Sequence, residues 1–201
     1  MKTRLTRAQQ LERTHQRLLD AGWSVFARRG YLATTVEEIA AAAGYTRGAV
    51  YKHFGGKEGL WQAITDARTE AHLRVLRDAL ERAGNRDELV AALAMSGNTD
   101  EDATRWSVVS AEFLAAAVAQ PERAGAAVDA QRRREGEIAT VLVRHCDRLG
   151  IRPAVPLLQA VIALGALGGG LSLRAVVDPG VDAAAVASVV VAAVFPETGS
   201  E

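Results

Sequence analysis

The sequence of 201 residues is poor in cysteine, proline and histidine, and these shortages bear on disulfides, fold class and metal sites in turn. The single cysteine, Cys146, cannot form an internal disulfide, so we expect a reducing, cytoplasmic setting. Only 5 prolines interrupt the chain, and its alanine-rich and leucine-rich segments lack alternating β-branched runs, which predicts an all-α fold. The 4 histidines are scattered without metal-ligand spacing. We therefore expect no metal site and no bound cofactor.

The formal net charge of the whole chain is zero, but the charges are distributed unevenly along it. Residues 1–60 hold ten of the 24 lysines and arginines and five of the 24 aspartates and glutamates, a balance of +5. The other 141 residues therefore carry −5. A basic segment ahead of an acidic remainder favours a polyanionic partner for that segment, although a solvated helix surface would show the same charge.

No apolar core of a secretory signal is present near the N-terminus. Residues 154–173 are twenty positions without a charge and contain Gly165-x-x-x-Gly169, which meets the minimal length of a transmembrane helix. Pro156, Gln159 and several glycines make that stretch only weakly hydrophobic. We therefore expect no membrane span, and interpret it as a helix buried between partners.

Capping patterns and hydrophobic periodicity divide the chain into about nine helices. Capping boxes begin at Thr6 and Thr35, where side chains three residues apart satisfy free backbone N–H groups. Gly44 supplies the left-handed residue that ends a helix. The Thr99-x-x-Asp102 pattern indicates a further start. The expected helices cover residues 6–30, 35–44, 46–53, 57 onward, 86–95, 99–117, 121–150, 154–176 and 182–194.

The short helix at residues 46–53 follows a glycine turn, as in a helix-turn-helix, and combines small, charged and hydrogen-bonding side chains: Thr46, Arg47, Gly48, Ala49, Tyr51, Lys52 and His53. Small residues at its N-terminus let the backbone approach the floor of a major groove. Arg47 can there make a bidentate contact to guanine. Thr35 and Lys57, at the starts of the flanking helices, can hold phosphates. The alternative is that part of this surface, His53 included, is merely solvated.

Three segments of this region, Thr34 to Ala40, Gly44 to Phe54 and Lys57 to Leu60, resemble the signature of the TetR family of bacterial transcriptional regulators. The resemblance covers about residues 15–62. It implies an all-helical homodimer with a DNA-binding domain, here residues 1–56, and a ligand-binding and dimerising domain, here residues 57–201. The family's base-proximal positions correspond to Arg47, Gly48 and Ala49, and its phosphate contacts to Thr35, Tyr45, Thr46, Tyr51, His53 and Lys57. Tyr45 departs from the pattern, which more often has a small aliphatic residue there.

Catalytic spacing is missing from residues 63–201, so we expect no enzyme. His145 and Cys146 are adjacent, but neighbours on a helix diverge by about 100° and do not form a nucleophile–base pair. His145 continues an apolar stripe, and it is either a core residue or a ligand group.

Trp106, Ser110 and Phe113 share one helix face, which forms either plain core or the wall of a small-molecule pocket with one polar group. Two functions stay open at this point. The first, which we favour, is a repressor released from its DNA operator by a small ligand bound to residues such as these and His145. The second is a DNA-binding dimer without an effector, whose C-terminal domain only dimerises or docks a protein.

The helices at 154–176 and 182–194 are too apolar to face water, which predicts a homodimer through a four-helix bundle. Glycines within the first of them would let helix backbones approach closely. Two-fold symmetry would place the paired DNA-reading helices about 34–36 Å apart. The operator is then expected to be palindromic.

Overall fold

The computed structural model describes residues 6–95, 101–119 and 121–197. Within these ranges the chain forms helices and no strand, which confirms the predicted all-α class. The helices are α1 (Arg7–Ala33), α2 (Val36–Ala43), α3 (Arg47–Phe54), α4 (Lys57–Arg82), α5 (Arg86–Met95), α6 (Glu101–Ala119), α7 (Pro121–Leu149), α8 (Leu157–Val177) and α9 (Ala183–Val194). The helix start expected at Thr99 lies outside the described residues.

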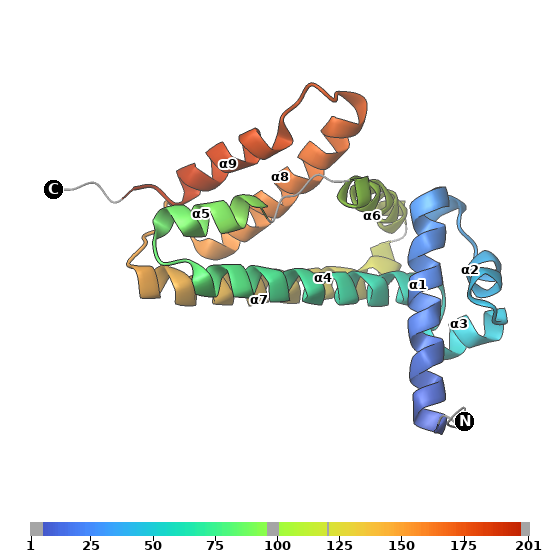
Figure 1. The fold of residues 1–201 in the computed structure, drawn as a ribbon. Coiled ribbons are helices and arrows are strands. Elements are labelled where there is room, and N and C mark those ends of the chain that lie inside the picture. The colour runs from blue at the N-terminus through green and yellow to red at the C-terminus, as the bar shows by residue number, and fades with distance from the viewer. Residues whose placement is uncertain (1–5, 96–100, 120, 198–201) are drawn as a thin grey trace. The chain divides into compact units, whose positions relative to one another are not determined.

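The chain folds as two compact units (Figure 1). The first contains Met1–Arg68 and Val109–Ala119, and so holds α1 to α3, the start of α4 and the C-terminal part of α6. The second contains Thr69–Val108 and Gln120–Glu201, and so holds the rest of α4 and α6 with α5, α7, α8 and α9. Both α4 and α6 therefore contribute residues to each unit.

Local signals account for the shape of the first unit. The capping boxes form at Thr6 and at Thr35, with Gln9 and Glu38 as the reciprocal partners. Helix α1 breaks at Gly30, whose φ of 78° and ψ of 169° are not helical. Gly44 ends α2 in the left-handed conformation, so the turn into α3 has the geometry that its sequence predicts.

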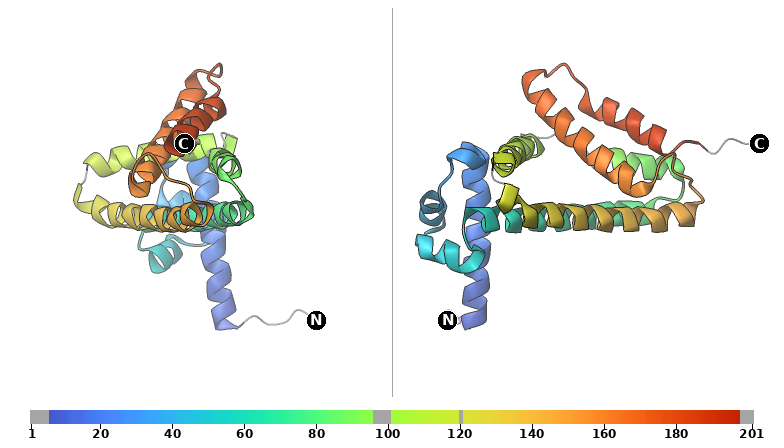
Figure 2. Two further views of the ribbon diagram at one scale, coloured as in Figure 1. Left: turned by 90° about the vertical axis from the view of Figure 1, so that its left-hand side faces the viewer. Right: turned by 180° about the vertical axis from the view of Figure 1, so that it is seen from behind.

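Apolar side chains from α4, α5, α7, α8 and α9 form the core of the second unit; its fully buried members are Leu80, Leu89, Leu142 and Phe195. Arg148 donates to the carbonyls of Leu80 and Ala83 at 2.9 and 2.8 Å, where α4 ends. Figure 2 shows α8 and α9 side by side in both views. Arg86 fastens the end of α9 by donating to the carbonyl of Phe195 at 2.7 Å.

Helix α8 is long and apolar enough to cross a membrane, with a mean hydropathy of 1.8, and only 17% of its most apolar window is buried within the chain. Length and composition alone are weak indications of a span. Several apolar side chains of α8 and α9 face outward, and Val177 and Val189 are 79% and 70% exposed. A single copy of the chain therefore leaves this apolar face uncovered.

Candidate DNA interface and ligand site

Helix α3 is held by one apolar face. Val50 is fully buried with Leu18 of α1 and Ile39 of α2 in the core of the first unit. The ring of Phe54 lies 4.6 Å from the ring of His15, measured between centroids. An eight-residue helix is too short to be stable alone, so these contacts hold it in place and leave its opposite face exposed.

The turn between α2 and α3 is pinned to α1. The hydroxyl of Thr14 donates to the hydroxyl of Tyr45 at 3.3 Å, and this bond lowers the pKa of Tyr45. Tyr45 was expected at a phosphate, and the aromatic departure from the family pattern thus has a structural partner. Thr46 begins α3 without capping it through its side chain. Its hydroxyl makes no hydrogen bond with the described residues, which leaves it available to a ligand.

The exposed face of α3 carries the expected DNA-reading side chains: Arg47, Gly48, Tyr51 and Lys52 are exposed, and Ala49 is half-buried. The guanidinium of Arg47 lies 3.3 Å from the carboxylate of Glu37 in α2. Because both side chains are solvent-exposed, this pair contributes little to stability and can open. While it is formed, the ion pair with Glu37 keeps the guanidinium of Arg47 at the N-terminus of α3.

Two expected phosphate contacts, Thr35 and Lys57, already have partners. The hydroxyl of Thr35 accepts from the backbone of Glu38 at 3.3 Å and donates to its carboxylate at 3.1 Å. The ammonium of Lys57 donates at 3.0 Å to the carbonyls of both Tyr31 and Thr34. It also lies 4.5 Å from the centroid of the Tyr31 ring. Lys57 thus fastens the end of α1 to α4, and one of its three N–H groups is left for a phosphate.

His53 lies at the end of α3, with its ring centroid 5.9 Å from that of His15. Burial lowers the pKa of His53, and the positive charges of His15 and Lys52 lower it further. His53 is therefore neutral at pH 7 in the free protein, and it would contact a phosphate there as a hydrogen-bond donor.

The geometry of α1 to α3 is thus that of a helix-turn-helix with an exposed second helix. The family model of the bacterial regulatory proteins of the tetR family matches residues 18–64, which span these helices and the start of α4. The chain belongs to the TetR family. The HTH-type transcriptional regulator SrpR of Pseudomonas putida is 46% identical over 61 residues, 30% of this chain and 29% of the relative.

The chain spans less than half the length of the curated TetR-family relatives that it matches. Solved structures match over nearly all of it. A TetR-family regulator from Rhodococcus sp. superposes with a TM-score of 0.75 over 91% of this chain and 98% of that one, at 21% identity. The triclosan complex of SmeT, the repressor of a multidrug efflux pump of Stenotrophomonas maltophilia, gives 0.67 over 92% and 93%, at 27% identity.

One structural feature of the first unit, called the DNA-binding unit from here on because it holds α1 to α3, is not predicted from the sequence. The carboxylate of Glu112, in α6, accepts from the backbone N–H of Leu32 at 3.0 Å. A side chain at Gly30 would collide with this carboxylate. Phe113 packs edge-on against Tyr31, with ring centroids 5.2 Å apart. The C-terminal part of α6 therefore supports the end of α1, across a sequence separation that no local pattern reveals.

The four residues predicted for a ligand wall are divided between the two units. Ser110 and Phe113 belong to the first unit, where Phe113 also lies 5.8 Å from Trp61 between ring centroids. Trp106 and His145 belong to the second unit. Trp106 is half-buried, and His145 is only 5% exposed.

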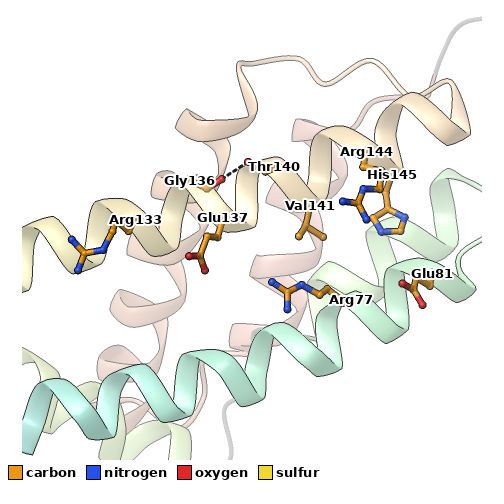
Figure 3. A pocket seen from close by; sticks show the side chains of 9 residues that line it. All are labelled: Arg77, Glu81, Arg133, Gly136, Glu137, Thr140, Val141, Arg144 and His145. Carbon is orange, nitrogen blue, oxygen red and sulfur yellow. Dashed lines mark hydrogen bonds between the residues drawn. The ribbon is translucent and has the colours of Figure 1, made fainter.

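His145 lines a groove of about 660 Å³ between α4 and α7 (Figure 3). Arg77 and Glu81 of α4 and Arg133, Glu137 and Arg144 of α7 supply its charges. This groove brings several polar and charged groups together within the second unit, which makes it a candidate ligand site.

Proposed function

We propose that this TetR-family protein is a sequence-specific DNA-binding repressor that a small molecule, bound in its C-terminal domain, releases from a palindromic operator. The observation that carries the proposal is the exposed face of α3, which presents Arg47, Tyr51 and Lys52 while Val50 anchors the helix. A bidentate guanidinium reads guanine, and the flanking groups hold the DNA backbone.

A homodimer through α8 and α9 is part of this proposal. The exposed apolar side chains of both helices favour a second copy of the chain as the cover. In α8, a side chain added at Gly165, Gly168, Gly169 or Gly170 would meet no atom within 4 Å. Each glycine weakens an isolated helix by about 1 kcal/mol, so their presence in α8 supports the close approach of a partner helix.

Release by a small molecule rests on the groove of the second unit and on the likeness to SmeT, which was solved with triclosan bound. Helix α4 carries groove residues and also belongs to the DNA-binding unit. A ligand releases DNA only if it binds the form of the protein with low DNA affinity more tightly. About 1–3 kcal/mol of coupling between the two sites is enough for a switch.

Selection of binding sites from random duplex DNA with the full chain tests the DNA-binding part. We expect an inverted repeat whose half-sites are separated by one helical turn or a multiple of it. Arg47→Ala is expected to cost about 1–3 kcal/mol and to relax the preference at one base position in each half-site. Identical base preferences for the wild type and Arg47→Ala would refute the role given to Arg47.

The second function, a DNA-binding dimer without an effector, predicts that no small molecule changes operator affinity. A diverse panel of compounds, followed by melting temperature and by fluorescence anisotropy of labelled operator, separates the two. A compound that shifts both supports the ligand-released repressor. A panel without effect on either favours the dimer alone.

A further inference from the structure

The groove between α4 and α7 has a charge that differs from that of the region around it. Residues 61–201 carry 14 arginines, no lysine, and 19 acidic residues. Three of those arginines, Arg77, Arg133 and Arg144, nevertheless gather on this one groove with two acidic side chains. An excess of guanidinium groups in an otherwise acidic region favours an anionic ligand.

Two of these arginines have no ion-pair partner among the described residues, and the third has only a long contact. Arg77 is only 3.8 Å from a carboxylate oxygen of Glu70, too far for a hydrogen bond. Arg133 and Arg144 make no ion pair with a described residue. The groove's neighbour Arg148 is different, because it donates to two backbone carbonyls and is unavailable. Figure 3 shows the guanidinium of Arg77 pointing from α4 toward α7.

His145 adds a further polar group to the groove. Its Nδ1 lies 3.3 Å from a guanidinium nitrogen of Arg148, which can only donate, so this contact favours the tautomer with the hydrogen on Nε2. Burial lowers the pKa of His145, and Arg148 and Arg144 lower it further against the opposing effect of Glu81. This histidine is therefore neutral at pH 7. Its Nε2 forms no hydrogen bond with the described residues but is open to solvent, since none of their buried side-chain nitrogens lacks a partner, and the residue lines the groove.

The groove is long and open along α7. Arg133, Glu137, Thr140 and Arg144 recur at helical spacing on one face, over about 16 Å of helix axis. Gly136, on the same face, leaves space where a side chain would otherwise stand. A volume of about 660 Å³ is suited to a small organic molecule.

We propose that this groove binds a small polyol that carries a phosphate or carboxylate group. The arginines bind the anionic group, and the Nε2–H of His145 donates to an oxygen of the ligand. The carboxylates of Glu81 and Glu137 accept hydrogen bonds from hydroxyl groups, and they disfavour a bare inorganic anion by repulsion. This proposal names the chemical class of the effector, so it rests on the proposed function for the step of DNA release.

Calorimetry with the full chain at constant ionic strength tests the ligand class. The probes are glucose 6-phosphate and gluconate, compared with uncharged glucose and with inorganic phosphate. We expect at least one of the two charged polyols to bind, and glucose and inorganic phosphate to bind at least about tenfold more weakly. Equal binding of glucose, equal binding of inorganic phosphate, or no binding of either charged polyol at millimolar concentration would overturn the proposal.

Two variants locate the binding in the groove. Gly136→Leu fills the groove and adds a better helix former at a position where the new side chain meets no atom within 4 Å. Gly125→Leu is its control, since Gly125 is equally open on α7 and does not line the groove. Arg77→Gln removes one guanidinium, and Arg132→Gln is the matched control on α7. We expect only the two groove variants to lose binding, by tenfold or more.

Unchanged binding in both groove variants would place the anion elsewhere, for example on the basic DNA-binding unit, and would refute the site. Operator release, measured by anisotropy in the same buffers, is the separate arm for function. If Gly136→Leu abolishes binding of the polyol, but the polyol does not release operator from the wild type, the site is upheld and its role as the effector site is refuted. Release by an uncharged compound that persists in Gly136→Leu would uphold the repressor and refute this groove.

Discussion

The two units of the chain use polar side chains differently. In the DNA-binding unit, many charged or hydroxyl side chains of the candidate interface have close protein partners: Thr35 caps α2, Lys57 holds two carbonyls, and Tyr45 bonds to α1. In the second unit, α8 and α9 present apolar side chains outward while arginines line a groove. The side-chain bonds of the first unit thus hold one small surface in place. The second unit presents two surfaces on which we propose that partners bind.

The largest effect is expected where the second unit is proposed to pair. Gly169→Leu adds a side chain that has room in the single chain, so the protomer should fold. It would separate the helices of a dimer and reduce operator affinity by about 10²-fold or more, because two half-sites would no longer be bound by one particle. Light scattering and anisotropy measure both changes. Gly125→Leu, an equally open position on α7, is expected to stay dimeric, and a dimeric Gly169→Leu with full affinity would contradict the arrangement.

The contrast between the units is sharpened by Glu112, which ties α6 into the DNA-binding unit. Glu112→Ala leaves the N–H of Leu32 without its acceptor, and we expect a loss of about 1–2 kcal/mol in the free energy of unfolding. Operator affinity should fall with it, because the end of α1 precedes the capped start of α2. Urea unfolding and anisotropy provide the measurements.

Glu101→Ala is the matched control on the same helix, since Glu101 makes only an exposed ion pair with Arg105. Its stability is expected to change by less than about 0.5 kcal/mol. Equal effects of the two substitutions would show that the contact of Glu112 has no special role.

These residues also show where prediction from sequence succeeds and where it stops. The capping boxes at Thr6 and Thr35 and the turn at Gly44 involve side chains within a few residues, so the sequence predicts them well. Glu112 meets Leu32 across 80 positions, and Arg86 meets Phe195 across 109. Such contacts depend on the packing of whole helices, and no local pattern carries them.

The same limit applies to the candidate sites. The exposed face of α3 follows from its helical period and its neighbours, and the structure leaves Arg47 and Lys52 where that period puts them. The groove lined by Arg77 and Arg144 could not be predicted, because it requires α4 and α7 to lie together. The sequence signal for it was the arginine-rich segment of α7, which alone is typical of a solvated face.

Substitutions of Lys57 and Lys52 separate two roles, which are support of the interface and direct contact with DNA. Lys57→Ala removes two hydrogen bonds to carbonyls, so the free energy of unfolding should fall by about 1–2 kcal/mol, discounted for partial exposure. Lys52→Ala removes an exposed charge and should leave stability unchanged. It should instead lower DNA affinity for all sequences and reduce the salt dependence by about one unit of slope for each protomer. Equal stabilities of the two variants would contradict the fastening role of Lys57.

The smallest effect concerns His53, whose lowered pKa couples folding and DNA binding to pH in opposite directions. The unfolded chain binds a proton near the ordinary histidine pKa of about 6.5, before the folded protein does. The contribution of His53 to stability is therefore complete above pH 6.5 and is lost as the pH falls through the folded value. His145 acts in the same direction, because its pKa is also lowered.

DNA would reverse this dependence if His53 contacts a phosphate, because a nearby negative charge raises the pKa of a histidine. Binding would then take up a proton at each protomer, and operator affinity should rise as the pH falls from 8 to 6, by less than the roughly tenfold per unit and per protomer that uptake of one whole proton would give. His53→Gln should remove this rise while leaving the acid destabilisation due to His145. His15→Gln, on the neighbouring ring, is the control that should keep the rise. An affinity with the same pH dependence in the wild type and His53→Gln would show that His53 supports α3 without contacting the DNA.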